Sequence, residues 1–168
     1  MKKAFTLIEI LIAITILSIM MLFLYKSYSS LNISNNIYEN ELVQIKNGYT
    51  KKKVLYLDFS LEHKEMTKIL NQDTKSDVVF MQSSHSIHKR HNPYIAYIVH
   101  DFKLYRLESI NEFKKYPLSS GREYVADCLG EVNSFRVYPS KGDEASYLVH
   151  ADFKEDEDIL LKIKALVQ

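Results

Sequence analysis

The chain is poor in the residues that cross-link, bend or interrupt a polypeptide. Cys128 is the only cysteine, so an intramolecular disulfide is excluded and the fold must be stabilised by packing. Four glycines and three prolines are present in 168 residues, and no proline precedes Pro93. This distribution predicts long helix in the first half of the chain and a turn-rich fold in the second.

Neither charge nor glycine is concentrated in a way that indicates a nucleic acid, a nucleotide or a reaction. The formal net charge is +1, which argues against nucleic acid as an obligatory partner, because such binding rests on neutralising phosphates. Four glycines leave no glycine-rich phosphate loop, and no Ser/His/Asp or Cys/His signature frames the acidic residues. The sequence therefore predicts neither an enzyme nor a bound cofactor.

A long apolar run lies at the N-terminus. Lys2 and Lys3 precede residues 5–25, which contain no glycine or proline and a single charged residue, Glu9. As a helix this run is about 30 Å long, the thickness of a bilayer core. Its hydroxyl side chains are compatible with lipid because they can bond backbone carbonyls of the same helix. We expect one membrane-spanning helix, with the lysines in the cytoplasm and the rest of the chain outside.

Glu9 is unusual inside such a helix. A carboxylate in a membrane-spanning segment is unfavourable, although less so near an end, and it usually has a partner. No basic residue lies within one helical turn on the same face. We therefore expect the partner of Glu9 to come from another molecule or from a newly made chain terminus.

Residues 3–9, Lys-Ala-Phe-Thr-Leu-Ile-Glu, resemble the class III signal of type IV pilins and pseudopilins. The resemblance implies that a prepilin peptidase cuts between Ala4 and Phe5 and that the new amine of Phe5 is methylated. It also implies that Glu9 pairs with the N-terminal amine of a neighbouring subunit during fibre assembly. Ala4 departs from the family, which usually has glycine at this position, although alanine is also small. The chain also departs from the many pilins that carry a C-terminal disulfide loop.

Two other interpretations of the N-terminus are open. A secretory signal peptide has an apolar core of about 7–15 residues and a small-residue exit, whereas this core is longer and has no such exit. An uncleaved anchor would keep Met1 or Lys2 and would carry a periplasmic binding or enzymatic domain, with Glu9 tolerated near the interface. That interpretation predicts a ligand pocket, which the sequence does not indicate.

Residues 26–70 are predicted to continue the membrane run as an amphipathic helix. Apolar and aromatic residues recur there at steps of three and four, the spacing of one helical face. They are Tyr38, Leu42, Ile45, Tyr49, Tyr56, Phe59, Met66 and Leu70. Gly48 marks a place where bending would be easy, and Asn71 is a reasonable helix stop. We expect the remainder of the chain to cover this apolar face.

Residues 71–168 are predicted to form a β-rich domain. Residues 78–81 are typical of a buried strand, and residues 94–99 and 103–108 of two strands joined tightly at residues 100–102. Further strands are expected at residues 134–138, 147–153 and 160–166, and residues 122–129 are ambiguous between helix and strand. The predicted fold is α+β, with one long N-terminal helix packed on an antiparallel β-sheet. Its parts are a leader at 1–4, a transmembrane helix at 5–25, a helical continuation at 26–70 and the β-rich domain at 71–168.

The order of these elements is similar to that of J-type minor pseudopilins of type II secretion. The resemblance spans residues 55–110 and rests on a helix with Leu57 and Asp58, a Val-Phe strand and a tyrosine-rich hairpin ending at Arg106. It implies a non-enzymatic minor subunit of a pseudopilus tip. Minor pilins of type IV pili and of DNA-uptake (competence) systems share this architecture and give the alternative function. For DNA uptake, five basic residues would have to share one surface: Lys51, Lys52, Lys53, Lys89 and Arg90.

The pilin resemblance also implies a location and a set of partners. The chain would cross the bacterial inner membrane once, with its N-terminus in the cytoplasm and its C-terminal domain in the periplasm. Its partners would be the prepilin peptidase, other minor and major pilin-like subunits, the inner-membrane assembly platform and membrane lipid. No cofactor and no obligatory nucleic acid are implied.

Two clusters suggest metal ions, and each has a simpler explanation. His85, His88 and His91 are closely spaced, but the segment before Pro93 is typical of an exposed loop. The acidic turn at residues 152–158 would suit calcium, but it lacks the EF-hand spacing and central glycine, so a solvated charge run between strands is favoured. No metal site is predicted.

Asp58, Glu62 and Glu65 form a third cluster at helical spacings of four and three. Paired carboxylates can serve acid–base catalysis. On a charged helix flank, however, they usually pair with nearby lysines, here Lys64 or Lys68. We therefore expect these three residues to lie on a charged flank of the helix and to pair with these lysines.

Overall fold

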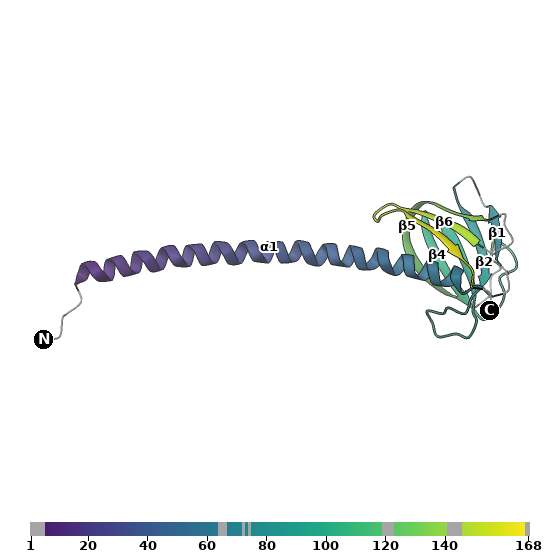
Figure 1. Ribbon diagram of the computed structural model, residues 1–168, viewed down its shortest axis with the longest axis horizontal. Helices are drawn as coiled ribbons and strands as arrows, with labels where there is room; N and C mark the ends of the chain where they lie inside the picture. The colour runs from purple at the N-terminus through teal and green to yellow at the C-terminus, as the bar shows by residue number, and fades with distance from the viewer. Residues whose placement is uncertain are drawn as a thin grey trace. The chain divides into compact units, whose positions relative to one another are not determined.

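The computed structural model describes residues 6–63, 67–71, 73, 75–118, 123–140 and 146–166. Within them lie one helix and seven strands (Figure 1). In chain order they are α1 (Leu7–Ser60), β1 (Lys68–Asn71), β2 (Asp77–Gln82), β3 (Tyr94–His100), β4 (Lys103–Ser109), β5 (Val125–Pro139), β6 (Ser146–Phe153) and β7 (Ile159–Lys164). The chain divides into two compact units, Met1–Lys46 and Asn47–Gln168.

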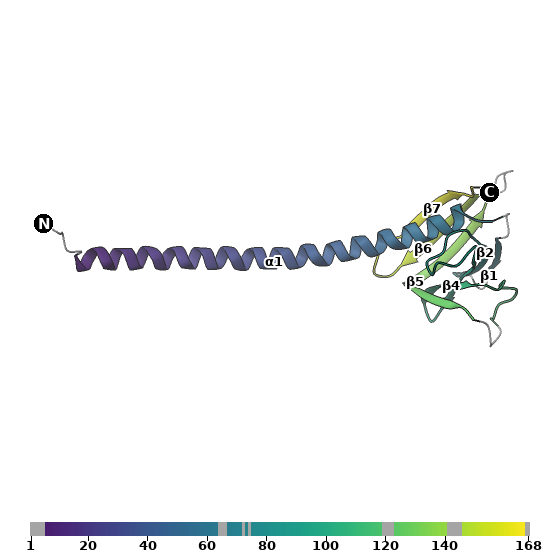
Figure 2. The same cartoon turned by 90° about the horizontal axis from the view of Figure 1, so that it is seen from below.

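The seven strands of the C-terminal unit form one antiparallel sheet in sequence order, β1 to β7. Strand β5 is the longest, and its first part pairs with β4 while its second part pairs with β6. The register shifts between Leu104 and Tyr105 on β4 and again between Val132 and Ser134 on β5. Such irregularities bend a strand and increase its twist. The sheet accordingly curls around the last turns of α1, as Figure 2 shows.

The α+β fold predicted from the sequence is confirmed. The strands expected at residues 78–81, 94–99 and 103–108 are β2, β3 and β4. Those expected at residues 134–138, 147–153 and 160–166 fall on β5, β6 and β7. The ambiguous stretch becomes a strand from Val125 onward.

Strands β3 and β4 are joined by a two-residue turn at Asp101 and Phe102. Both residues have positive φ, 48° and 58°, as a type I′ turn requires. The twist of this turn matches the twist of the flanking strands, so it supports the hairpin predicted here. Its register places Tyr97 directly opposite Arg106.

The main core lies between α1 and the inner face of the sheet. Leu55 and Phe59 of α1 are fully buried there, and the Phe59 ring lies 6.0 Å from the Tyr97 ring. Alternate residues of the strands face this core, as the two-residue period of a strand dictates. In β6 these are Tyr147, Val149, Ala151 and Phe153. Burying a large apolar side chain contributes about 1.5–3 kcal/mol, so Leu55 and Phe59 hold the helix end firmly.

The face of α1 that meets the sheet differs from the predicted one. Tyr49, Tyr56 and Phe59 were expected to share a covered face, but Tyr49 and Tyr56 are 67% and 50% exposed. The buried face instead contains Leu55, Asp58 and Phe59. The prediction is confirmed for Phe59 and wrong for Tyr49 and Tyr56, because it followed apolar spacing alone, whereas the sheet binds a face that includes a charged residue.

The predicted continuation of the helix to Leu70 is also wrong. Helix α1 ends at Ser60, and Leu70 lies in β1, which pairs with β2. Between them, the His63 N–H donates to the Gln82 carbonyl at 2.8 Å. Backbone pairing with β2, which is distant in sequence, therefore overrides the local helical spacing.

Gly130 lies next to the register shift of β5 and has a φ of +133°. A Cβ at this position would lie 2.8 Å from Lys51 Nζ and 3.5 Å from the Phe153 ring. The same lysine lies over that ring, 4.4 Å from its centroid, and forms an ion pair with Asp156. Glycine thus leaves room for a lysine of α1 to reach the loop between β6 and β7.

The two described glycines are expected to respond in opposite ways to alanine. Gly130→Ala should lower the free energy of unfolding by about 1–3 kcal/mol, because both its φ and the contact with Lys51 oppose a side chain. Gly48→Ala should raise it by about 0.5–1 kcal/mol, since Gly48 is helical and an added Cβ meets no atom within 4 Å. Chemical denaturation of the full chain in detergent micelles measures both changes. Equal effects of the two substitutions would contradict this account.

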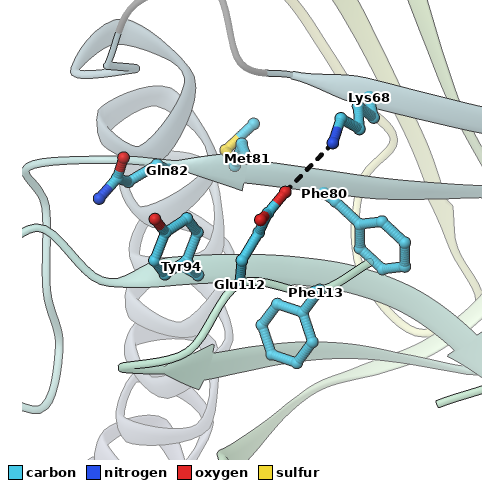
Figure 3. A pocket seen from close by; sticks show the side chains of 7 residues that line it. All are labelled: Lys68, Phe80, Met81, Gln82, Tyr94, Glu112 and Phe113. Atoms are coloured by element: carbon cyan, nitrogen blue, oxygen red, sulfur yellow. Dashed lines mark hydrogen bonds and ion pairs between the residues drawn. The ribbon is translucent and has the colours of Figure 1, made fainter. Parts of the chain in front are cut away.

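A second, smaller core covers the opposite face of β2, β3 and β4. Residues 110–118 return across this face, and Phe113 packs on Phe80 with ring centroids 5.9 Å apart. Glu112 of the same segment pairs with Lys68 of β1 at 3.2 Å (Figure 3). Strand β2 is therefore covered on both sides, which explains why it is buried almost throughout.

Candidate assembly site

Helix α1 begins with a capping arrangement that involves Glu9. The Thr6 carbonyl accepts hydrogen bonds from the Glu9 and Ile10 N–H groups at 3.1 and 3.4 Å. In return, the Glu9 carboxylate accepts from the Thr6 N–H at 3.0 Å and from the Thr6 hydroxyl at 2.9 Å. The Thr-x-x-Glu spacing of residues 6–9 is the sequence signal of a capping box, of which the bond from the Thr6 N–H to the Glu9 side chain is formed here. A search restricted to charged partners misses this signal.

The donors from Thr6 leave the charge of Glu9 unbalanced. They satisfy hydrogen-bonding capacity of the carboxylate but bring no positive charge. The Glu9 side chain is also exposed, so a cation from another molecule can approach it. In apolar surroundings a carboxylate remains unfavourable until a counter-charge arrives. Glu9 is therefore able to pair with a positively charged group of another molecule.

Ala4 and Phe5, the predicted cleavage and methylation positions, lie outside the described residues. The described chain begins at Thr6, the next residue in sequence. The roles of Ala4, Phe5 and Glu9 stay predictions.

Residues 7–25 of the N-terminal unit form an apolar helical stretch with exposed side chains. In the part of the chain that the structure describes, α1 is the one helix long and apolar enough to cross a membrane. The residues of its most apolar stretch are not buried by the rest of the chain. Thr15 and Ser18 donate their hydroxyls to the carbonyls of Ile12 and Ile14, both at 2.8 Å, as expected for a lipid-facing helix. An apolar surface of this size needs lipid or other helices around it.

A cluster of buried polar side chains joins the end of α1 to the sheet. We define the polar cluster as Asp58, His85, Tyr97, Arg106 and Glu108. Arg106 is fully buried and donates to Asp58 through Nε at 2.7 Å and Nη2 at 3.2 Å, a bidentate geometry. The Tyr97 hydroxyl donates to the same carboxylate at 2.5 Å, and His85 Nδ1 lies 2.5 Å from its other oxygen. One residue of α1 is thus held by two strands and a loop.

Glu108 extends the polar cluster into the loop between β2 and β3. Arg106 Nη1 donates to its carboxylate at 2.7 Å, which also accepts from the Ser86 hydroxyl at 2.6 Å and the Ile87 N–H at 3.1 Å. Arg90 donates to the Glu108 backbone carbonyl at 2.8 Å. The loop is therefore fastened onto β4.

Burial changes proton affinities inside the polar cluster. Burial and the neighbouring Asp58 carboxylate raise the pKa of Tyr97 well above its usual value. Burial alone would lower the pKa of Arg106, but the hydrogen bond and charge of Asp58 outweigh it, so this pKa is raised. Burial also opposes ionisation of Glu108, yet hydrogen bonds from Ser86 and Arg106 bring the Glu108 pKa below its usual value. Arg106 therefore stays charged and Tyr97 stays protonated near neutral pH.

Tyr97 is expected to make folding sensitive to alkaline pH. Because its pKa is higher in the folded chain than in the unfolded chain, where it is about 10, only the unfolded state loses this proton just above that pH. The free energy of unfolding should then fall by up to ~1.4 kcal/mol per pH unit on account of this residue. Denaturation curves at alkaline pH should show a flatter decline for Tyr97→Phe, which costs about 1 kcal/mol at neutral pH. An unchanged decline would contradict the buried phenol.

The prediction that Asp58 and Glu62 lie on a charged flank of the helix is wrong. Asp58 is fully buried in the polar cluster, and Glu62, which is 2% exposed, accepts from the Thr67 N–H at 2.8 Å. Lys68, a predicted partner, pairs with Glu112 instead. Both acids lie near the point where the chain passes from α1 to the sheet, and both side chains are buried there. Lys64 and Glu65 of the same prediction lie outside the described residues, as does Met66 of the predicted helical face.

The histidines between β2 and β3 contact different carboxylates. His85 contacts Asp58, whereas His88 Nε2 lies 2.9 Å from Asp127 of β5. His91 is exposed. Among the described residues, no group of three or more His, Cys, Asp or Glu side chains could hold a metal ion. The segment expected to be a solvated loop is therefore anchored through two of its histidines.

The acidic turn after β6 faces lysines of α1. Asp156 forms an ion pair with Lys51, and both side chains are largely buried. Glu157 lies 3.6 Å from Lys52. The expectation of a solvated charge run therefore fails for Asp156, because the C-terminal end of α1 passes close to this loop. Two of the basic residues needed for a DNA-binding surface are engaged by the same contacts.

Two of the hollows in the described part of the C-terminal unit bear on ligand binding. The first, between Phe80, Tyr94 and Glu112, is a cavity of about 20 Å³ (Figure 3). It has room for about one water molecule and not for an organic ligand. The second is an open groove in which Cys128, an exposed thiol, lies beside Val54 of α1.

Comparison with known proteins gives one match, at the N-terminus. Residues 1–25 match the family model described as the prokaryotic N-terminal methylation motif. No curated protein and no solved structure matches the chain. The matched segment is the class III prepilin signal, and it contains both Glu9 and the exposed apolar part of α1 up to Tyr25. The chain therefore carries the N-terminal methylation motif of type IV pilin-like proteins at the head of a pilin-like α+β fold.

Proposed function

We propose that this chain is a non-enzymatic minor pilin-like subunit that is cut between Ala4 and Phe5, methylated at Phe5 and assembled into the pseudopilus tip of a type II secretion system. The observation that carries the proposal is the methylation motif at residues 1–25, placed on a helix whose apolar side chains are exposed. Such a helix has to be covered by lipid before assembly and by other helices afterwards.

Removal of the leader creates the counter-charge that Glu9 lacks. The new N-terminal amine belongs to Phe5, and the Phe5 amine of a neighbouring subunit approaches the exposed Glu9 carboxylate. Pairing neutralises both charges inside the apolar surroundings and fixes the axial stagger between the two subunits. The Thr6 donors hold the carboxylate in place at the helix start until then.

The proposed location follows from the same segment. The chain crosses the bacterial inner membrane once, with the leader in the cytoplasm and the chain after residue 25 in the periplasm, because Lys2 and Lys3 precede the apolar run. Prepilin peptidase, the inner-membrane assembly platform and other minor and major pilin-like subunits are its partners there.

Two observations favour secretion over DNA uptake. Asp58 and Arg106, on which the resemblance to J-type minor pseudopilins rests, form the buried pair that joins α1 to the sheet. Of the basic residues that DNA uptake would require, Lys51 contacts Asp156 and Arg90 donates to Glu108. A minor pilin of a type IV pilus or DNA-uptake system is the second candidate, since it would share the methylation motif.

Crosslinking in intact membranes tests the proposal. The tagged chain is expressed at its native level, crosslinked and purified, and its adducts are identified by mass spectrometry. We expect adducts with other minor pseudopilins of a secretion system. Adducts with a major pilin of a pilus or uptake system would support the second candidate, and the absence of any pilin-like adduct would contradict both.

A further inference from the structure

One side of α1 in the N-terminal unit carries an exposed stripe beyond the membrane run. We define the seam as positions separated alternately by three and four residues: Tyr28, Leu31, Asn35, Tyr38, Leu42 and Ile45. The apolar members are 62% to 68% exposed, and Asn35 is exposed as well. Nothing in the described part of this unit covers the seam.

The spacing of the seam is that of a coiled coil. Alternating steps of three and four average 3.5 residues per turn, which keeps a stripe facing a partner helix along a left-handed supercoil. The other apolar residues of this segment are Ile33, Ile37 and Val43. They do not extend into a stripe, because Asn40 and Gln44, the next positions after Ile37 on that side, are polar.

We propose that the seam binds a second copy of this chain, with the two helices parallel and in register. Parallel orientation rests on the proposed single-pass insertion, which points both helices out of the membrane the same way. In register, Asn35 of one copy faces the partner's Asn35, and the two side-chain amides hydrogen-bond to each other. A single asparagine at such a position selects two-stranded, in-register pairing.

Charges beside the seam fit the same arrangement. Glu41 and Lys46 flank it on opposite sides, five residues apart. In a parallel, in-register pair, residues with this separation face each other across the interface, so Glu41 of each copy meets the partner's Lys46. A shift by one heptad would place Asn35 against Leu42 and bury an amide without its partner.

Cysteine crosslinking of the full chain in its own membranes tests the pairing. In a Cys128→Ser background, Asn35→Cys is expected to give a disulfide-linked dimer on mild oxidation. Asn36→Cys, the same substitution one position away from the seam, is the matched control and is expected to give little. Adding Glu41→Lys should reduce the Asn35→Cys dimer by about fivefold or more, because both cross-helix pairs become repulsive. Adding Lys46→Glu to that variant should restore the dimer.

Three results would overturn the proposal. They are equal crosslinking of Asn35→Cys and Asn36→Cys, no recovery on charge exchange, and adducts of Asn35→Cys with another protein in place of itself. The N-terminal mass of the chain in the same samples reports removal of the leader independently. A chain that starts at Phe5 but does not crosslink through residue 35 contradicts the seam alone, whereas an intact leader contradicts the proposed function.

Discussion

Replacing Arg106 with methionine is expected to lower the free energy of unfolding of the C-terminal unit by about 3–5 kcal/mol. Arg106 is fully buried and bonded to both Asp58 and Glu108. Methionine fills much of the same volume but leaves two buried carboxylates without a counter-charge. Because Asp58 lies on α1, the attachment of the helix end to the sheet should weaken as well. Denaturant titration of the full chain in detergent micelles, followed by tyrosine circular dichroism, measures the loss.

Arg136→Met is the matched control for this prediction. Arg136 is 23% exposed in its side chain, lies 3.5 Å from Asp77 and donates to the Asp73 carbonyl at 3.0 Å. Asp77 is buried but keeps the hydrogen bond from the Val137 N–H, and Arg136 itself is partly in contact with water, so its replacement should cost less than that of Arg106, about 1–3 kcal/mol. If Arg106→Met were no more destabilising than Arg136→Met, the polar cluster would not be the attachment described here.

Glu9→Ala is expected to leave membrane insertion intact and to reduce incorporation into the assembled complex by about tenfold or more. Without Glu9, the amine of the neighbouring Phe5 enters apolar surroundings with no counter-charge. Insertion persists because the apolar run is unchanged. Membrane fractionation measures insertion, and the amount of the variant recovered with crosslinked partner subunits measures incorporation.

Glu9→Gln separates charge pairing from helix capping. Glutamine can still accept from the Thr6 N–H, as in other capping boxes, but it cannot neutralise an amine. If charge pairing is the role of Glu9, Glu9→Gln should reduce incorporation into the complex nearly as much as Glu9→Ala. Normal incorporation of Glu9→Gln together with loss of Glu9→Ala would assign Glu9 a capping role only.

The strands could be predicted because their signals are local. Residues 78–81 form a continuous apolar run, which is typical of a strand covered on both faces, and β2 is such a strand. In β7, Lys162 and Lys164 alternate with Ile163, as expected at the edge of a sheet. The hairpin at Asp101 was predictable in position, although its positive φ values were not, since neither turn residue is glycine.

The end of α1 and its buried face could not be predicted from local spacing. Leu70 continues a helical pattern, but the backbone around it pairs with β2, a contact that exists only in three dimensions. Tyr49 and Tyr56 also fit the pattern and are nevertheless exposed. Part of that pattern belongs to the exposed side of the helix, which the sequence alone does not distinguish from the sheet-facing side.

The polar cluster left one signal in the sequence. Arg106 lies on the same side of its strand as Leu104, which faces the main core. Tyr105 and Leu107 lie on the other side. A charged residue on the inward side of a strand requires a buried partner, and Asp58 supplies it. The identity of that partner depends on how α1 packs, so only the structure could provide it. Near the N-terminus, by contrast, the hydrogen bond from the Thr6 N–H to the Glu9 carboxylate could be predicted from spacing alone.

The N-terminal mass of the chain isolated from its own membranes tests the central claim most directly. Purified protein would be digested, and its first peptide would be identified by mass spectrometry. We predict a chain that starts at Phe5 with a methylated amine. A chain that keeps Met1 or Lys2 would contradict processing between Ala4 and Phe5, and with it the pilin-like role.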